Sequence, residues 1–277
     1  MLTNSTFLKG LAIRATDGEL GTVKEFYFDD DTWTIRYLIV ETGGWLLGRE
    51  VLISPISIIG VDWKNNRLDV ALTKKQVEHS PNIDIHQPVS RQDEADYSGY
   101  YAYNYYWGGP YMWGSAFYPA DLSRNGLMEV AKEKVRRESA YSHLRSSETV
   151  TGYHVESTDG EIGHVTGFVV DDEVWAVRYL EVATRNWLPG KKVLVAPAWI
   201  LRVSWMDSNV YAFLSEEDIE SAPEYLLDRP LTREYESLLY MHYGRPPYWL
   251  HEADRRASFS LTSAVSVSPL SQSRPLH

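Results

Sequence analysis

The stretch Thr16-Asp17-Gly18-Glu19-Leu20-Gly21 returns, with one conservative change, as Thr158-Asp159-Gly160-Glu161-Ile162-Gly163. The offset is 142 residues, because 158 − 16 = 142. The same offset, without any gap, matches Phe26 with Phe168, Trp33 with Trp175, Arg36-Tyr37-Leu38 with Arg178-Tyr179-Leu180, Pro55 with Pro197, Trp63 with Trp205, Pro81 with Pro223, and Tyr106-Trp107 with Tyr248-Trp249. The chain is therefore an internal duplication, and its two units run from about Gly10 to Trp107 and from Gly152 to Trp249.

The apolar pattern inside each unit is that of short strands. In the first unit the strands are expected at about 11–15, 21–28, 34–41, 50–53, 58–63 and 68–72. A tight turn is expected at Asp17-Gly18, because glycine accepts a positive φ at little cost. Thr73 and Gln76 have the spacing of a capping box, which predicts a short helix that ends before Pro81; Ser215 takes the cap position in the second copy. Six short strands joined by tight turns favour a sheet closed on itself.

We therefore expect a mainly β protein with two tandem six-stranded barrels, each followed by a short helical and aromatic extension. The predicted organisation is a leader at 1–9, a first barrel at 10–81, an aromatic and glycine-rich extension at 82–120, a charged helical linker at 121–150, a second barrel at 151–223, a helical extension at 224–252 and a disordered tail at 253–277. The tail is rich in serine and contains Pro269 and Pro275, a composition typical of disorder.

Composition narrows the function classes. The 277 residues carry a formal net charge of −11 and contain no cysteine. A nucleic acid is not expected as a partner, because phosphate binding needs clustered Lys and Arg. Disulfides, thiolate chemistry and zinc sites built on cysteine are excluded. The N-terminal residues lack the pattern of a signal peptide, and no apolar stretch approaches the ~20 residues of a membrane span, so we expect a cytoplasmic protein.

The sequence offers no catalytic or cofactor motif: a phosphate loop, a nucleophile elbow and a His-Glu-x-x-His pattern are all absent. The acidic clusters Asp29–Asp31 and Asp171–Glu173 could hold a hard cation, but they fit solvated turns better. The eight histidines are scattered. We expect no enzyme activity, no cofactor and no metal, although a small-molecule or hydrolytic site in a cleft between the barrels is a third, weaker hypothesis.

The most unusual segment is 97–118, which reads YSGYYAYNYYWGGPYMWGSAFY. Ser90 and Thr232 are each expected to cap a helix at the start of an extension. The first extension continues into many more aromatic residues than the second, and we take it as the candidate surface for a protein partner. The candidate interaction residues are Tyr105, Trp107, Tyr111 and Trp113. The competing interpretation is that these rings seal the joint between the two barrels.

The run Gly-Leu-x-Ile followed by Thr-Asp-Gly-Glu-Leu-Gly, Phe28-Asp29-Asp30 and Ile35-Arg36-Tyr37-Leu38 resembles the PRC-barrel family. The resemblance is repeated in the second copy. It covers about half of the chain. The signature residues, which we expect to be structural, are Asp17, Gly18, Gly21, Asp30, Arg36, Tyr37, Asp159, Gly160, Gly163, Asp172, Arg178 and Tyr179. The family occurs in the H subunit of purple bacterial photosynthetic reaction centres and in the ribosome maturation factor RimM.

The resemblance implies a non-catalytic adaptor that binds one or more unidentified protein partners. A first alternative is a regulatory protein similar to the reaction-centre H subunit, at the periphery of a membrane electron-transfer complex. A second, which fits the charge poorly, is an RNA- or ribosome-associated factor similar to RimM. A homo-oligomer is also open, because duplicated units commonly pack through surfaces that substitute for a two-fold interface.

Overall fold

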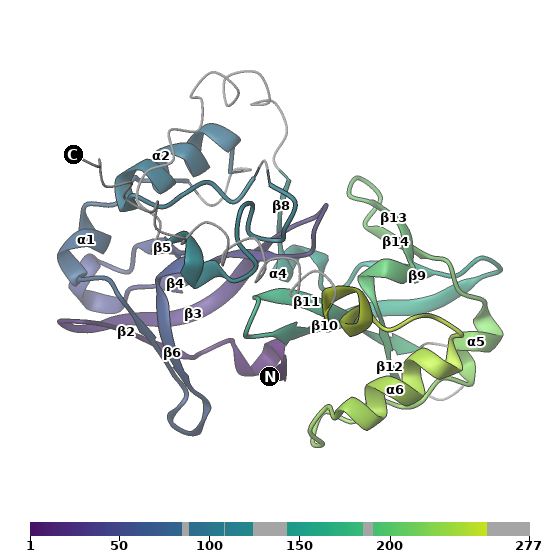
Figure 1. Cartoon of the computed structure of the whole chain (residues 1–277). Coiled ribbons are helices and arrows are strands. Elements are labelled where there is room, and N and C mark those ends of the chain that lie inside the picture. The colour runs from purple at the N-terminus through teal and green to yellow at the C-terminus, as the bar shows by residue number, and fades with distance from the viewer. Residues whose placement is uncertain (85–88, 108, 124–142, 185–190, 254–277) are drawn as a thin grey trace, which may run out of the picture.

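The computed structural model describes residues 1–84, 89–107, 109–123, 143–184 and 191–253. In these residues the two copies form two seven-stranded sheets. The sheets lie side by side, the first in purple and blue and the second in teal and green (Figure 1). The predicted mainly β class is therefore confirmed. We call residues 10–81, together with the extension that follows them up to residue 123, the first domain, and residues 151–253 the second domain.

The two sheets have the same topology. The first contains β2 (Ala12–Ala15), β3 (Gly18–Asp29), β4 (Ile35–Glu41), β5 (Glu50–Ile53), β6 (Ile58–Asp62) and β7 (Arg67–Val70). The second contains β9 (His154–Glu156), β10 (Glu161–Asp171), β11 (Ala176–Thr184), β12 (Lys192–Val195), β13 (Ile200–Ser204) and β14 (Asn209–Ala212). The strand orders are β5-β4-β3-β2-β7-β6 and β12-β11-β10-β9-β14-β13. Neighbours are antiparallel except β2 with β7 and β9 with β14, which are parallel.

The seventh strand of each sheet corrects the prediction of six. Each domain supplies six strands of its own sheet. The seventh strand of each sheet is a short segment that precedes the other domain in the sequence, and it pairs with the long strand of the sheet. Strand β1 (Leu2–Asn4) pairs with β10, and β8 (Leu144–Ser146) pairs with β3. The long strands β3 and β10 extend beyond their first neighbours, and the added strands pair an edge that would otherwise be left open.

This exchange of strands is reciprocal and obeys the 142-residue offset. Leu2 lies opposite Asp171, and Leu144 lies opposite Asp29. The first residue after each exchanged strand repeats the relationship. The Ser5 hydroxyl accepts the backbone N–H of Phe168 at 3.1 Å, and the Ser147 hydroxyl accepts that of Phe26 at 3.2 Å. The expected leader therefore contributes β1 to the second sheet, and the end of the expected linker contributes β8 to the first.

The helices begin at the predicted caps. Thr73 and Ser215 form capping boxes at the starts of α1 (Lys74–Glu78) and α5 (Glu216–Glu220). Ser90 caps α2 (Arg91–Tyr101), and Thr232 caps α6 (Arg233–His242). The remaining helical elements are α4 (Ser147–Val150), a helical stretch at 248–253, and the 3-10 turns η1 (Ser5–Phe7), η2 (Gly43–Leu46), η3 (Pro55–Ser57), η4 (Trp63–Asn65), η5 (Pro119–Leu122) and η6 (Pro197–Trp199). No helix of these described parts is long and apolar enough to cross a membrane.

Several signature residues have structural roles that recur in both copies. A carboxylate oxygen of Asp17 accepts the first backbone N–H of α1 at 2.8 Å, and Asp159 does the same for α5. A Cβ added at Gly21 would lie 1.9 Å from the carbonyl oxygen of Glu41. At Gly163 it would lie 1.9 Å from that of Ala183, at the same offset. Only glycine allows these two strands to approach so closely.

The two domains share one hydrophobic core. A single cluster of buried apolar side chains includes residues of both sheets. At its centre the start of β4 meets the start of β11: Ile35 donates to the carbonyl of Trp175 at 2.7 Å, and Val177 donates to that of Trp33 at 2.8 Å. Trp33 and Trp175 have the same φ of 55°. The two tryptophans that the 142-residue offset pairs therefore occupy equivalent backbone positions.

Two predictions fall largely on residues that are not described. Most of the charged helical linker, 124–142, and nearly all of the expected disordered tail, 254–277, lie outside the described residues.

Candidate functional site

Arg178 on β11 is the centre of a buried polar cluster in the second domain. Its guanidinium lies 2.7 Å from the carboxylate of Asp171 and forms an ion pair with Glu252. The ring of Tyr248 packs over it, with the ring centroid 4.1 Å from the guanidinium carbon. Burial opposes the charge, but hydrogen bonds to Glu252 and the charge of Asp171 outweigh it and raise the pKa of Arg178. The cation is therefore permanent.

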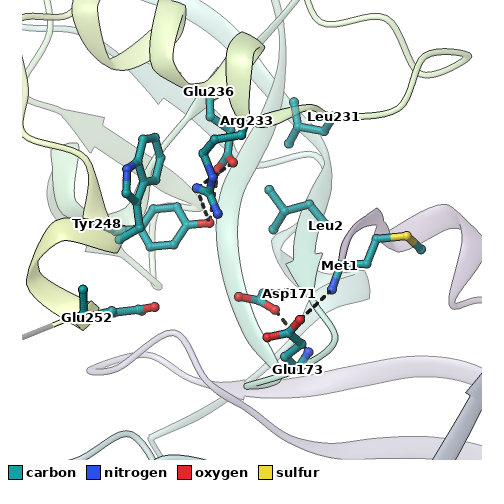
Figure 2. Close-up of a pocket in the computed structure, with 11 residues that line it drawn as sticks. Met1, Leu2, Asp171, Glu173, Leu231, Arg233, Glu236, Tyr248 and Glu252 are labelled. Atoms are coloured by element: carbon teal, nitrogen blue, oxygen red, sulfur yellow. Dashed lines mark hydrogen bonds and ion pairs between the residues drawn. The ribbon is translucent and has the colours of Figure 1, made fainter. Parts of the chain in front are cut away.

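Glu236 on α6 forms the second part of this cluster. It accepts a hydrogen bond from the Tyr179 hydroxyl at 2.7 Å and one from the Tyr248 hydroxyl at 3.2 Å. Arg233, three residues earlier on the same helix face, pairs with it at 2.9 Å. Burial raises the pKa of the Glu236 carboxyl. Figure 2 shows Arg233 between Glu236 and the hydroxyl of Tyr248.

The first domain contains most of this cluster at the 142-residue offset, but Pro110 stands at the position equivalent to Glu252. Arg36 lies 3.5 Å from Asp29 and 3.8 Å from the ring centroid of Tyr106. Glu94 accepts hydrogen bonds from the hydroxyls of Tyr106 and Tyr37, and it pairs with Arg91 at 3.2 Å.

Glu94 is 2% exposed, and burial raises the pKa of its carboxyl to about 7. The pairs Arg91/Arg233, Glu94/Glu236 and Tyr106/Tyr248 match in sequence. The sequence therefore contained the signal, but only the fold shows that these residues surround the arginine.

Two hollows flank the cluster in the second domain. The hollow of Figure 2 has a volume of about 390 Å³, and Leu2, Asp171, Arg233, Glu236 and Glu252 are among its lining residues. The second hollow, of about 480 Å³, lies at the joint between the domains and is lined by Trp33, Met112, Arg178, Ala198, Trp199, Tyr248 and His251 among others. We call the second one the joint hollow. Tyr248 and Glu252 line both hollows.

In the first domain the aromatic extension covers the corresponding place. Met112 accepts a hydrogen bond from Arg36 on its carbonyl oxygen at 2.7 Å. The indole of Trp113 is fully buried, lies 4.9 Å from the Arg36 guanidinium and donates its N–H to the carbonyl of Val174 at 2.8 Å. The 3-10 turn η5 packs on η3 of the same domain.

The four predicted interaction residues are therefore not an exposed surface. Trp113 is buried in the joint, and Tyr105, Trp107 and Tyr111 are each partly buried. The rings of Tyr105 and Trp107 stack with centroids 4.4 Å apart, and Arg91 lies over Trp107 at 4.6 Å. Rings of the extension cover apolar surface of both domains, as the competing interpretation expected, whereas the prediction that these four residues bind a partner stays a prediction.

The two acidic turns each hold cationic groups. Asp30 pairs with Arg145 at 2.7 Å and with His143 at 3.5 Å. At the same offset, Asp172 forms an ion pair with the Met1 amino group, and it accepts the indole N–H of Trp63 at 2.9 Å. Asp30, Asp31 and His143 have potential ligand atoms within 4.8 Å of one another. The strand exchange brings His143 there, which the scattered histidines of the sequence did not indicate.

The arrangement is suited to binding. The carboxylates of both clusters are paired with arginine, tyrosine or both. Arg178, which is paired with Asp171 and Glu252, lines the joint hollow together with the ring of Tyr248.

Among curated proteins, none matches the chain at a significant level. Residues 5–77 match the family model of the PRC-barrel domain. This span covers the strands β2 to β7 of the first sheet and most of α1, which are also the residues that gave the resemblance. The second domain repeats its signature and its strand order. The first domain of this chain is therefore a PRC-barrel domain.

Proposed function

We propose that this protein is a non-catalytic adaptor that binds a partner protein through the uncovered face of its second domain. A PRC-barrel domain suggests a module for protein interaction. The observation that carries the proposal is a difference between two equivalent residues. Ile56 on η3 is 6% exposed beneath the aromatic extension, whereas Ala198 on η6, 142 residues later, is exposed.

A duplication first produces two domains with identical surfaces. In the described residues, the aromatic extension covers the face of the first domain, and the equivalent face of the second domain is open. Covering a face with the chain's own aromatic residues removes it as a contact surface. The other face keeps apolar side chains beside a buried charge, a composition that is typical of the centre of a protein interface. This supports the assignment of the first domain to internal assembly and of the second to partner contact.

The experiment is cross-linking of the tagged full-length chain in the cells that produce it, followed by mapping of the cross-linked residues. We expect a protein joined to the second domain, near residues 196–199 and 245–252. Cross-links confined to the first domain would contradict the proposal. So would a purified chain that turns over a substrate with a stoichiometric cofactor. A second copy of the chain would appear as a dimer in sedimentation, and homo-oligomerisation would then replace the adaptor function.

A further inference from the structure

The joint hollow has a filled counterpart in the same molecule. Its lining residues Val177, Arg178 and Tyr248 correspond, at the 142-residue offset, to Ile35, Arg36 and Tyr106. The larger set that lines it also includes Trp33 and Met112 from the first copy. The duplication therefore allows the occupied and the open version of one site to be compared within a single chain.

The occupant in the first domain is an indole. The Trp113 ring has 0% exposure, packs edge-on to Tyr106 at 6.4 Å between centroids, and lies beside the guanidinium of Arg36. An indole face carries negative partial charge and complements a guanidinium, and its N–H finds a backbone carbonyl, here that of Val174. The residue equivalent to Val174 is Thr32, which lines the joint hollow.

The chain does not encode an indole for the second site at the equivalent position. The residue 142 positions after Trp113 is Arg255. The second copy therefore has no aromatic residue at the position equivalent to Trp113, and an indole in this site would come from another position or another molecule.

The way in which Trp113 is presented indicates that the external ring belongs to a polypeptide. Tyr111 and Gly114 form a β-bridge, and so do Trp113 and Ala116, so that a tight turn projects the indole. Phe117, next in the turn, is 2% exposed and packs on Val174 and Ala176. The volume of about 480 Å³ is in the range of sites that take a drug-sized ligand, so it leaves room for more than one ring.

We propose that the joint hollow binds a tryptophan-bearing turn of the partner protein, with the indole beside the stacked pair of Arg178 and Tyr248, as Trp113 lies beside the stacked pair of Arg36 and Tyr106. This rests on the adaptor function proposed above and adds the chemistry of its partner.

The test is a fluorescein-labelled peptide with the sequence of residues 110–118, PYMWGSAFY, titrated into the full-length chain and followed by fluorescence anisotropy. We expect saturable binding that weakens at least 10-fold when the peptide tryptophan is replaced by alanine. Ala198→Phe, which fills the hollow from an exposed position, is expected to weaken binding by at least the same factor. Leu201→Phe, on the 68% exposed Leu201 of β13, is the matched control and is expected to leave it unchanged.

A peptide with a photo-reactive group beside its tryptophan makes the test independent of any variant's folding. On the unmodified chain it should label residues 196–199. Labelling of the first domain instead, or equal affinity of the alanine peptide, would overturn the proposal. Phe259 is an aromatic residue of the C-terminal tail. Binding of the peptide that appears only in a Phe259→Ala variant would also overturn the proposal, because the chain's own tail would then be the occupant of the hollow. If the native partner is still cross-linked to the second domain in Ala198→Phe, the adaptor function stands and the tryptophan site is wrong.

Discussion

Phe26 and Phe168 lie 142 residues apart in the sequence and pack edge to face across the joint, with ring centroids 5.6 Å apart and planes at 75°. Both are almost completely buried. Each is the residue whose backbone N–H is bound by the serine of the exchanged segment. The same sequence position in the two copies thus meets itself, as residues do at the two-fold axis of a homodimer.

This pair gives the first prediction. Phe26→Ala and Phe168→Ala are each expected to lower the free energy of unfolding by about 3–5 kcal/mol, because a large buried ring is lost. In a double-mutant cycle measured by urea denaturation, the coupling should be about 0.5–1.5 kcal/mol, typical of an edge-to-face pair. Phe26→Ala with Val193→Ala, in a strand of the other sheet, is the control, and additivity within ~0.5 kcal/mol is expected there. A coupling of zero for the phenylalanine pair would contradict the shared core.

The second prediction concerns the strand exchange. Ser147→Ala removes the acceptor of a buried N–H, whereas Ser5→Ala removes that of a partly buried one. A buried donor left unsatisfied costs about 1–3 kcal/mol, so we expect both variants to destabilise the protein, Ser147→Ala more than Ser5→Ala. Ser115→Ala, at an exposed position, should change stability by less than ~0.5 kcal/mol. Hydrogen exchange of the Phe26 amide checks the assignment, and it should accelerate in Ser147→Ala alone.

The third prediction is a pH dependence caused by Glu94. Its pKa rises from 4.5 to about 7 on folding, so the folded state holds the proton more tightly. The stabilising effect is complete below pH ~4.5 and is lost as the pH rises to about 7. The shift corresponds to about 3 kcal/mol at 1.36 kcal/mol for each pH unit. Glu94→Gln should flatten this part of the stability curve.

Chemical denaturation at pH 5, 6, 7 and 8 measures the effect. Asp96→Asn, on the exposed side of the same helix, is the control and should keep the slope of the unmodified chain. An unchanged slope in Glu94→Gln would show that this carboxyl is ionised throughout.

The fourth prediction tests the glycines of the signature. Gly21→Ala and Gly163→Ala place a methyl group against a backbone carbonyl that cannot move without displacing β4 or β11. We expect a loss of at least ~2–3 kcal/mol for each. Gly44→Ala has no heavy atom within 4 Å of the added Cβ and is expected to change stability little. Melting temperatures of the three variants decide the question, and a stable Gly21→Ala would mean that the strands are not in this close contact.

The fifth prediction concerns Trp113. Trp113→Ala should destabilise the chain by about 3–5 kcal/mol, because the ring is buried between both domains. Trp107→Ala, at a partly exposed ring of the same segment, should cost clearly less. Denaturant unfolding of the two variants compares them. Equal and small losses of stability in the two variants would show that the aromatic extension is an exposed surface and not a seal between the domains.

The amino-acid sequence by itself determined the duplication, the β class, the caps at Thr73, Ser90, Ser215 and Thr232, and the positions of most strands. These features depend on local patterns: alternation of apolar residues, turn glycines and hydroxyls beside free N–H groups. The PRC-barrel resemblance also lies in such local motifs, because Asp17 and Gly21 act within a few residues of a turn or on the next strand.

Only the tertiary structure decided which strand each short segment joins, and that the aromatic extension is a seal. Leu2–Asn4 and Leu144–Ser146 are too short to carry a periodic signal, and their pairing is fixed by the open edges of strands more than a hundred residues away. The identity of Trp113 in the sequence does not indicate whether its side chain is exposed or buried. Its burial depends on the carbonyl of Val174 and on a hydrophobic surface, both of which the second domain supplies. The open state of the equivalent site beside Arg178 is likewise decided by how the two domains meet.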